Sequence, residues 1–347
     1  MKRVKDPKLF LSIKTFLTLY LPEIRAKSRN TIKSYRDTLN LFFHFLKSRK
    51  NLPLHLVTTE DFSPLAVKEF LDWLIDERHC SSSTRNQRLS CIRTFYGYLA
   101  EENMELVDNY SKIQKIKQTP VPDRTLDVIL TIDDIRLILK QPNAESKMGL
   151  RDQFYMALLY DTGCRNSEIL NLRLKDIYIN SKGEGSIHVI GKGNKFRATP
   201  ISGHVLDLFN KYVAVFHPQL NKTQYLFYTV RKGIVNRMSN DNVSRFIKKY
   251  EMSAKAINPN LPSLHPHLFR HARAMHLYQA GMPLALVSEW LGHAQLETTL
   301  IYANADITLK QKAIEKVVNS NNSVFNEEPF KFENDEDVIK KLYGLAE

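Results

Sequence analysis

One segment, residues 111–126, limits how this chain can fold more than any other part of its sequence. It reads SKIQKIKQTPVPDRTL and is polar and basic, with Pro120 and Pro122 close together. Proline disfavours a helical conformation in the residue before it, so the segment is typical of an extended connection. Because 347 residues can form more than one hydrophobic core, we predict one domain on each side, with a linker over 113–126.

The part of the chain before the linker has the apolar spacing of α-helices. Apolar side chains recur every three or four residues in four segments, residues 8–21, 28–46, 62–77 and 81–103. Ser63 followed by Pro64 is typical of a helix start, because serine caps free amides and proline fits the first helical turn. Ser28 or Asn30 can cap the second helix in the same way. We predict a helical domain over residues 1–112.

Beyond the linker, helical patterns alternate with a pair of strands. A helix begins at Thr131, and the segment 151–164 continues a helical, apolar-rich domain. In residues 186–201, SIHVIGKGNKFRATPI, two alternating runs flank the turn residues 191–194, which is the pattern of a β-hairpin. The expected fold class is therefore mainly α with a small β-sheet, and the second domain, over 127–318, is mixed α/β.

The charge of the chain suggests a polyanionic partner. The formal net charge is +13, and residues 1–50 contain 13 Lys and Arg against 3 Asp and Glu. Nucleic acid is the first candidate and an anionic membrane the second. No apolar run approaches the roughly 20 residues that span a bilayer. No signal peptide is evident either, so we expect a cytoplasmic protein with no membrane partner.

Cysteine and histidine spacing gives little support for a metal site. Cys80, Cys91 and Cys164 are odd in number and widely spaced, so we interpret them as reduced thiols. His267 and His271 have the spacing of a zinc-binding pair, but no glutamate follows the first histidine and no third ligand is evident. We therefore expect no metal.

Two segments of the second domain carry a cation that can meet phosphate. In TGCRNSEI, residues 162–169, Arg165 follows a Thr-Gly break and Glu168 lies three positions on, a spacing that is also common in ordinary surface ion pairs. Lys192 lies at the tip of the hairpin, where a lysine is usually solvated but can also deliver an ammonium to a reacting phosphate. The surrounding Gly-Lys-Gly lacks the spacing of a nucleotide-binding Walker loop.

A further segment, residues 265–281, carries histidines and an arginine. It reads HPHLFRHARAMHLYQAG, which predicts a helix with His267 and Arg270 on one face. His267 can also be a structural histidine, and that is the role we assign to His271 and His276.

The last of these segments is LVSEWLGHAQLETTLIYAN, residues 286–304, which predicts two helices separated by a turn at Gly292. His293 then lies at the turn and Tyr302 on the second helix. A tyrosine in such a helix is normally a packing residue, so this segment alone assigns no chemistry to it.

In this order and at these separations, the four segments resemble the conserved boxes of the tyrosine recombinase (phage integrase) family, in its Xer-like two-domain form. TGCRNSEI resembles the box of the first arginine, VIGKGNKFR the lysine hairpin, HPHLFRH the His-x-x-Arg box, and LGHAQLETTLIYA the box of the second histidine and the nucleophile. SRNTIKSYRDTLNLFFHFL and SSSTRNQRLSCIRTFYGYL resemble the family's helical core-binding (SAM-like) domain. The resemblance covers residues 8–315 and implies that the second domain is catalytic.

The resemblance implies that Tyr302 attacks the scissile phosphate and keeps the 3′ end of the broken strand. Arg165 and Arg270 would hold the non-bridging oxygens, which suits guanidinium because it stays charged and donates bidentately. The phosphotyrosine bond retains the energy of the phosphodiester bond, so religation needs neither nucleotide nor metal, and we expect no cofactor.

The same resemblance makes Lys192 the general acid for the departing 5′ oxygen, with Lys195 as the nearby competitor for that role. His267 and His293 would contact the phosphate or accept the tyrosine proton, and which of the two is the base stays open. Glu168 matches a family position that supports the site from behind the residues that touch the DNA.

The partners implied by the resemblance are double-stranded DNA at specific recombination sites and further copies of the chain, as a homotetramer on two paired sites at a bacterial-type nucleoid. The candidate DNA contacts are six basic residues off the apolar stripes of two predicted helices, which we expect to be available to solvent: Arg29, Lys33, Arg36, Arg85, Arg88 and Arg93. The alternative for these residues is a solvated basic face without a partner.

Residues 319–347 form a tail that differs in charge from the rest of the chain. Residues 320–347 contain 7 Asp and Glu against 3 Lys and Arg, so the tail should not contact DNA. Its end has a short amphipathic pattern made of Val338, Ile339, Leu342 and Tyr343. This segment either docks as a helix on a neighbouring subunit, as the resemblance suggests, or is disordered.

We therefore expect a site-specific DNA recombinase that cuts and rejoins strands through a 3′-phosphotyrosyl intermediate. Integration, excision, transposition and resolution all fit this chemistry. One alternative is a type IB topoisomerase, which uses similar chemistry to relax supercoils, and another is a non-catalytic DNA-binding protein on the same scaffold. Relaxation without a paired site would identify the first, and absence of a covalent adduct the second.

Overall fold

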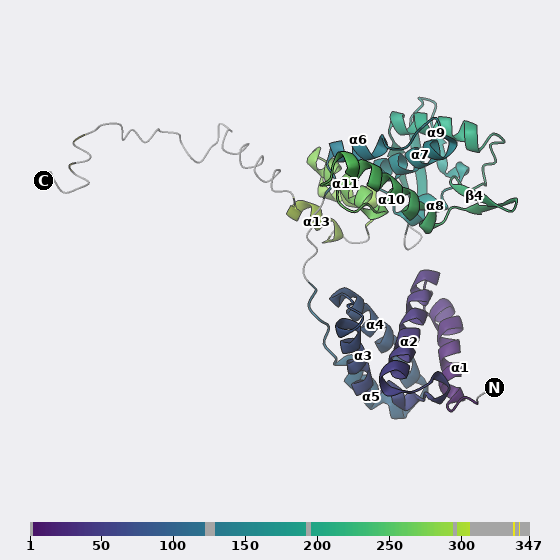
Figure 1. The fold of residues 1–347 in the computed structure, drawn as a ribbon, viewed down its shortest axis with the longest axis vertical. Helices are drawn as coiled ribbons and strands as arrows, with labels where there is room; N and C mark the ends of the chain where they lie inside the picture. The colour runs from purple at the N-terminus through teal and green to yellow at the C-terminus, as the bar shows by residue number, and fades with distance from the viewer. Residues whose placement is uncertain are drawn as a thin grey trace. The chain divides into compact units, whose positions relative to one another are not determined.

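The computed structural model describes residues 3–121, 129–191, 196–293 and 297–305, together with residues 336 and 340. The chain divides into two compact units, Met1–Asp123 and Arg124–Glu347. The first is a bundle of helices and the second combines helices with small sheets (Figure 1). The predicted fold class is confirmed, while the predicted domain limits stay predictions.

Five α-helices form the described part of the first unit. They are α1 (Pro7–Thr15), α2 (Arg29–Lys50), α3 (Pro64–Asp76), α4 (Ser82–Glu102) and α5 (Val107–Gln114), with a π-helical segment Phe16–Ile24 and 3₁₀ turns Leu54–Leu56, Thr59–Phe62 and Met104–Leu106. Ser28, Ser63 and Ser81 each accept a hydrogen bond from an amide of the helix that follows. The four predicted helices are confirmed. α5 was not predicted, and it ends inside the predicted linker.

Aromatic rings fill the core of the first unit. Phe16, Phe42, Phe62, Phe70 and Phe95 are fully buried. The ring centroid of Phe42 lies 4.5 Å from that of Phe62 and 5.2 Å from that of Phe70. Burying such a side chain contributes about 1.5–3 kcal/mol. These rings come from different elements, so their contacts fix how the helices of this unit pack.

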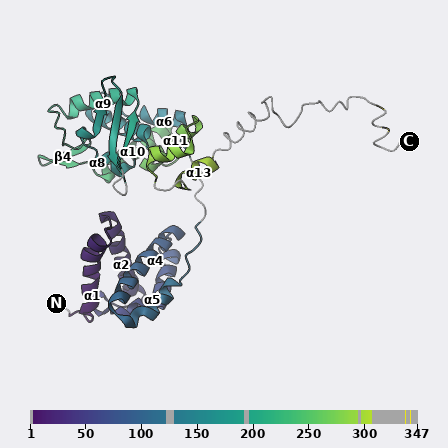
Figure 2. The same ribbon diagram turned by 180° about the vertical axis from the view of Figure 1, so that it is seen from behind.

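The second unit combines helices with two antiparallel sheets. Its helices are α6 (Ile132–Leu139), α7 (Lys147–Thr162), α8 (Asn166–Asn171), α9 (Gly203–Phe216), α10 (Asn240–Ile257), α11 (Pro266–Gln279), α12 (Leu284–Leu291) and α13 (Glu297–Ala305), with a 3₁₀ turn Leu174–Asp176. One sheet has the order β1 (Ile177–Ile179), β2 (Gly185–Ile190), β3 (Phe196–Ile201), and the other pairs β4 (Tyr228–Arg231) with β5 (Ile234–Arg237). Figure 2 shows the larger sheet from behind the view of Figure 1.

The β-hairpin predicted over residues 186–201 is confirmed. β2 and β3 are antiparallel, with Ile187 opposite Thr199 and Ile190 opposite Phe196. Ile187 is buried, whereas Ile190 and Phe196 are exposed. The strand ends next to the loop therefore lie at the surface of the unit.

The C-terminal end of α7 positions the residues of the site. Residues 154–159 of this helix are buried, and α9 and α11 pack against it. Gly163 ends the helix with φ +60°, and a Cβ atom there would lie 3.0 Å from Cδ2 of Leu291. A glycine is needed for this backbone conformation and for the close approach of α12. α12 ends in the same way at Gly292, with φ +65°, as the sequence predicts.

All three cysteines are free thiols, and Cys91 and Cys164 are buried. Within the described residues, no group of three or more His, Cys, Asp or Glu side chains could hold a metal ion. No helix in the same parts of the chain is long and apolar enough to cross a membrane.

Candidate active site

Arg165 and Glu168 form a largely buried pair. Arg165 is the N-cap residue of α8, and Glu168 is only 8% exposed. Oε1 of Glu168 accepts a hydrogen bond from Nη1 of Arg165 at 3.0 Å, and Oε2 accepts one from the Arg165 amide at 2.8 Å. Nη2 of Arg165 donates to the carbonyl oxygen of Gly292 at 3.2 Å. The carboxylate therefore fixes both the start of α8 and the direction of the guanidinium, which an ordinary surface pair does not do.

A second arginine, Arg197 of β3, shares the Glu168 carboxylate. Its Nη2 donates to Oε2 of Glu168 at 2.7 Å and to Sγ of Cys164 at 3.2 Å, and its Nη1 donates to Oε1 of Glu168 at 3.2 Å. Burial raises the pKa of Glu168, but the hydrogen bonds and charge of Arg197 outweigh burial, so the pKa lies below its ordinary value. The sequence placed Arg197 in the hairpin segment but could not identify its partner.

The backbone at the end of α12 holds both predicted arginines. Arg270 of α11 is 4% exposed, and its Nη2 donates to the carbonyl oxygen of Leu291 at 2.8 Å. Its Nη1 donates to the carbonyl oxygen of Gly163 at 2.7 Å. Because Leu291 and Gly292 are consecutive, the guanidinium groups of Arg165 and Arg270 bind neighbouring carbonyl oxygens.

These guanidinium groups raise the positive potential of the site. Burial and, next, the positive charge of Arg165 lower the pKa of Arg270 to about 10. Arg270 still carries its charge at neutral pH. The negative charge of Glu168 acts in the opposite direction but offsets only part of the lowering of the Arg270 pKa. An anion bound between two such cations would relieve their repulsion, which makes the site suitable for a phosphate.

The structure distinguishes the two histidines that were candidates for phosphate contact. Nδ1 of His293 lies 2.8 Å from Oγ1 of Thr299, and burial and then Arg270 and Arg165 lower the pKa of His293 to about 4. His293 is therefore neutral at pH 7. His267, at the start of α11, is exposed and makes no hydrogen bond to another described residue. Partial desolvation and the charge of Arg270 lower the pKa of His267 as well.

Tyr302 of α13 is fully buried and contacts a histidine that the sequence assigned a structural role. Its Oη lies 2.9 Å from Nδ1 of His271. Burial raises the pKa of Tyr302 to about 12, although the charge of Arg270 acts in the opposite direction. Sequence reasoning missed this contact, since a histidine directly after the His-x-x-Arg box carries no signal of its own.

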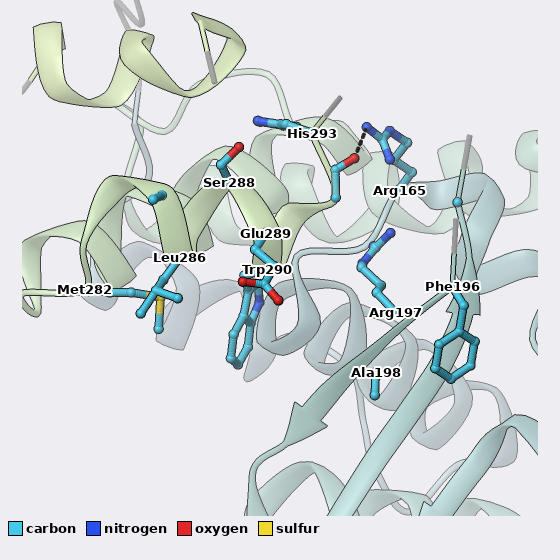
Figure 3. A pocket seen from close by; sticks show the side chains of 13 residues that line it. Arg165, Phe196, Arg197, Ala198, Met282, Leu286, Ser288, Glu289, Trp290 and His293 are labelled. Carbon is cyan, nitrogen blue, oxygen red and sulfur yellow. Dashed lines mark hydrogen bonds between the residues drawn. The ribbon is translucent and has the colours of Figure 1, made fainter. Parts of the chain in front are cut away.

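An open pocket of about 890 Å³ adjoins this cluster. Side chains of β3 and α12 face each other across it, with Arg165 near Arg197 of β3 and His293 beyond the end of α12 (Figure 3). Gly191 and Phe196, which flank the hairpin loop, also line it. The predicted acid Lys192 and its competitor Lys195 lie outside the described residues.

The six candidate DNA contacts differ in exposure. Those on α2 are exposed: Arg29, Lys33 and Arg36. The three arginines of α4, which we expected to be available to solvent, are only partly exposed, and each donates a hydrogen bond to a group of its own unit: Arg85, Arg88 and Arg93.

The partial burial of the arginines of α4 follows from their contacts with neighbouring segments. Nη1 of Arg88 donates to Oγ1 of Thr38 at 2.9 Å, and Nη2 of Arg93 donates to the carbonyl oxygen of Gln114, the last residue of α5, at 2.8 Å. The last carbonyl groups of a helix have no hydrogen-bond donor within the helix, and Arg93 supplies a donor for one of those of α5. Whether any of these residues contacts DNA stays a prediction.

Family comparisons cover most of both units. Residues 129–308 match the phage integrase family, and residues 13–103 match the phage integrase N-terminal SAM-like domain. The chain belongs to the phage integrase family.

Relatives of this phage integrase are similar over nearly all of its length. A protein of Sinorhizobium fredii (strain NBRC 101917 / NGR234), named as a candidate integrase/recombinase y4rC, is 30% identical over 337 residues, which cover 96% of this chain and 97% of the relative. Tyrosine recombinase XerD of Rickettsia prowazekii (strain Madrid E) is 30% identical over 314 residues, with 87% and 95% covered.

Solved structures share the fold of this phage integrase. The recombinase XerH, bound to a palindromic difH substrate after cleavage, has a TM-score of 0.65 at 21% identity, with 92% of this chain and 91% of that chain covered. A lambda integrase tetramer bound to a Holliday junction has a TM-score of 0.60 at 16% identity, with 88% and 77% covered. At these identities the likeness concerns the fold alone.

Proposed function

We propose that this chain is a site-specific tyrosine recombinase, which cuts and rejoins DNA through a covalent bond to Tyr302. The observation that carries the proposal is the pair of guanidinium groups held by the consecutive carbonyl oxygens of Leu291 and Gly292. Two cations that are fixed by neighbouring carbonyl oxygens suit the two non-bridging oxygens of one phosphodiester. Tyr302, with its charge interaction with Arg270, belongs to the same cluster.

In the proposed cleavage step, Oη of Tyr302 attacks the scissile phosphorus and the bond to the 5′ oxygen breaks. The 3′ end stays on the tyrosine, and Lys192 gives a proton to the departing 5′ oxygen. Arg165 and Arg270 stabilise the charge that builds on the phosphoryl oxygens. A 5′ hydroxyl of a partner strand then attacks the phosphotyrosine and reverses the step, which produces recombined strands.

Neutral His293 and exposed His267 fit contacts with the DNA backbone. A neutral imidazole whose Nδ1 is bound to Thr299 can present Nε2 to a phosphate oxygen. Such a contact would add a hydrogen bond without another positive charge. Glu168 would act on the reaction through the position of Arg165.

The partner of the reaction is double-stranded DNA, and the proposed assembly is a homotetramer on two paired sites. The net charge of +13 supports binding of duplex DNA. The lambda integrase tetramer bound to a Holliday junction, which shares the fold, supports the assembly. The segment 319–347 is the proposed connector between neighbouring subunits, and the structure describes only Glu336 and Lys340 of it, both helical.

The proposal is tested with a duplex selected for binding from a random library. Two copies of the selected duplex are placed in one plasmid, and the purified protein should exchange the segment between them. Relaxation of a supercoiled plasmid that lacks the duplex, with no exchange between two copies, would instead identify a type IB topoisomerase. Specific binding with neither exchange nor a covalent adduct would identify a non-catalytic DNA-binding protein.

A further inference from the structure

Within the described residues, the hydroxyl of Tyr302 has one hydrogen-bonding partner that can take up a proton, the imidazole of His271. Oη lies 2.9 Å from Nδ1 of His271, and the tyrosine side chain is fully buried. A buried phenol hydroxyl needs a partner, because leaving it without one costs about 1–3 kcal/mol. The position of the imidazole therefore fixes where the hydroxyl points.

The other two histidines of the site, His267 and His293, make no hydrogen bond with the hydroxyl of Tyr302 among the described residues. Nδ1 of His293 is bound to Thr299. His267 is exposed and makes no hydrogen bond within the described residues. The histidine that touches the reacting oxygen is therefore His271. The sequence offered only His267 and His293 as candidates for the base.

The nucleophile needs help to lose its proton. Burial raises the pKa of Tyr302 to about 12. At pH 7 only about one phenol in 10⁵ would then be ionised. A base in contact with Oη can remove the proton as the bond to phosphorus forms, so that a free phenolate is never required.

We propose that His271 is the general base for Tyr302, and that its Nδ1 both holds the hydroxyl in place and receives its proton during cleavage. This inference rests on the proposed function. It adds the residue that accepts the proton of Tyr302, which the cleavage step above does not name. His271 qualifies as a catalytic residue because it touches the reacting atom.

The protons and bonds of this step balance. The proton moves from Oη of Tyr302 to Nδ1 of His271 while the bond from Oη to phosphorus forms. The bond from phosphorus to the 5′ oxygen breaks, and that oxygen takes a proton from the general acid. In religation the 5′ hydroxyl attacks, and the imidazolium of His271 returns its proton to the tyrosine oxygen.

The same helix contains a matched control. Nδ1 of His276 lies 2.9 Å from the hydroxyl of Tyr160, which is the same contact between the same kinds of atoms, five residues further along α11. A substitution at His276 therefore reproduces the loss of a tyrosine–histidine hydrogen bond without touching the nucleophile.

The test compares His271→Asn, His271→Ala and His276→Asn for the rate of covalent adduct formation on a nicked duplex that traps the cleaved state. Asparagine keeps a polar atom near the position of Nδ1 but does not take up a proton. If His271 is the base, both His271 variants should be slower by about 10²–10⁴-fold. His276→Asn should cleave at close to the wild-type rate. Equal DNA affinity and far-UV circular dichroism establish that each variant is folded.

A second measurement separates a base from a residue that only positions the hydroxyl. Tyr302 is replaced by fluorinated tyrosines, whose phenols are more acidic, in the wild type and in His271→Asn. A base-deficient enzyme should regain activity as the phenol becomes more acidic, while the wild type should gain little. Cleavage by His271→Asn at the wild-type rate, or the same response to fluorination in both proteins, would overturn the assignment. Absence of any adduct in the wild type would instead refute the proposed function.

Discussion

The carboxylate of Glu168 lies 2.7 Å from Nη2 of Arg197, and both side chains are shielded from solvent, with 6% and 11% of their surface exposed. This pair links β3, the strand that follows the hairpin loop, to α8, of which Glu168 is the third residue. Arg165 binds the same carboxylate. The position of the Arg165 guanidinium therefore depends on both Glu168 and Arg197. β3 and Arg165 are thus joined in one ionic network.

Glu168→Gln should destabilise the second unit strongly. The substitution leaves the buried guanidinium of Arg197 without a charged partner, which typically lowers the free energy of unfolding by about 3–5 kcal/mol. Urea unfolding can be followed through the fluorescence of Trp290 in a Trp73→Phe background. The exposed Glu145→Gln should change the free energy of unfolding by less than about 0.5 kcal/mol. Equal stability of Glu168→Gln and Glu145→Gln would show that the network contributes nothing.

The same pair predicts a pH dependence with a definite sign. The pKa of Glu168 is lower in the folded protein than its ordinary value, mainly because the hydrogen bonds and charge of Arg197 outweigh the effect of burial. Its contribution to stability is therefore present above the ordinary glutamate value of about 4.3 and is lost as the pH falls through the folded value. Glu168→Gln should lack this part of the acid dependence.

The exposed face of α2 should contact DNA phosphates. Simultaneous replacement of Arg29, Lys33 and Arg36 by glutamine should weaken binding and reduce the slope of log affinity against log salt by about 0.9 for each phosphate that the variant no longer neutralises. Fluorescence anisotropy with the selected duplex, at several salt concentrations, measures both quantities.

The C-terminal end of the same helix provides the control, because two of its three basic residues are paired with acids. Arg49 contacts Glu77, and Lys50 contacts Glu69. The control variant replaces three residues by glutamine: Lys47, Arg49 and Lys50. If this variant and the first one reduce the salt slope equally, α2 has no specific phosphate-binding face.

The sequence predicted local structure well because local structure depends on neighbouring residues. Ser63–Pro64 starts α3, and Gly292 ends α12, each for a reason that lies within a few residues. Ser28 and Asn30 were equally acceptable as caps from sequence, and only the backbone geometry selects Ser28.

Contacts between distant segments were beyond the reach of these patterns. Arg93 was expected at the surface, but it donates to carbonyls at the end of α5, a helix that the sequence did not reveal. The partnership of His271 with Tyr302 joins residues 31 positions apart, and it depends on how α13 packs against α11. Periodicity predicts which face of a helix is apolar, but it does not predict which polar atoms meet across an interface.

Truncation after residue 320 should weaken assembly more than binding to a single half-site. The removed segment is acidic and is expected to connect subunits, not to contact DNA. Analytical ultracentrifugation with one-site and two-site duplexes measures the two effects separately. A truncated protein that pairs two sites as well as the full chain does would refute the role of the tail in assembly.

Lys192→Ala should cleave an ordinary phosphodiester very slowly but should readily cleave a substrate with sulfur at the 5′ bridging position. A thiol has a pKa of about 8.5, whereas the pKa of water and alcohols is about 16, so a thiolate departs without a proton. The acid then becomes dispensable. Rates of adduct formation on the two substrates give the comparison.

Two variants test the selectivity of this rescue. Lys195→Ala should show no selective gain with sulfur, and Arg165→Ala should not be rescued, since loss of charge stabilisation slows both substrates. Sulfur rescue of the Lys195 variant in place of the Lys192 variant would assign the acid to Lys195.

The central claim is that Tyr302 forms the covalent bond to DNA, and mapping the phosphotyrosine tests it most directly. Wild type, Tyr302→Phe and Tyr160→Phe are incubated with the nicked duplex, and the adduct is digested and identified by mass spectrometry. Tyr160→Phe loses a comparable hydrogen bond to a histidine of α11 and should still form the adduct. We predict a 3′-phosphoryl bond on the peptide that contains Tyr302, and none in Tyr302→Phe, with DNA affinity retained. An adduct on another residue, or one that persists in Tyr302→Phe, would contradict the account.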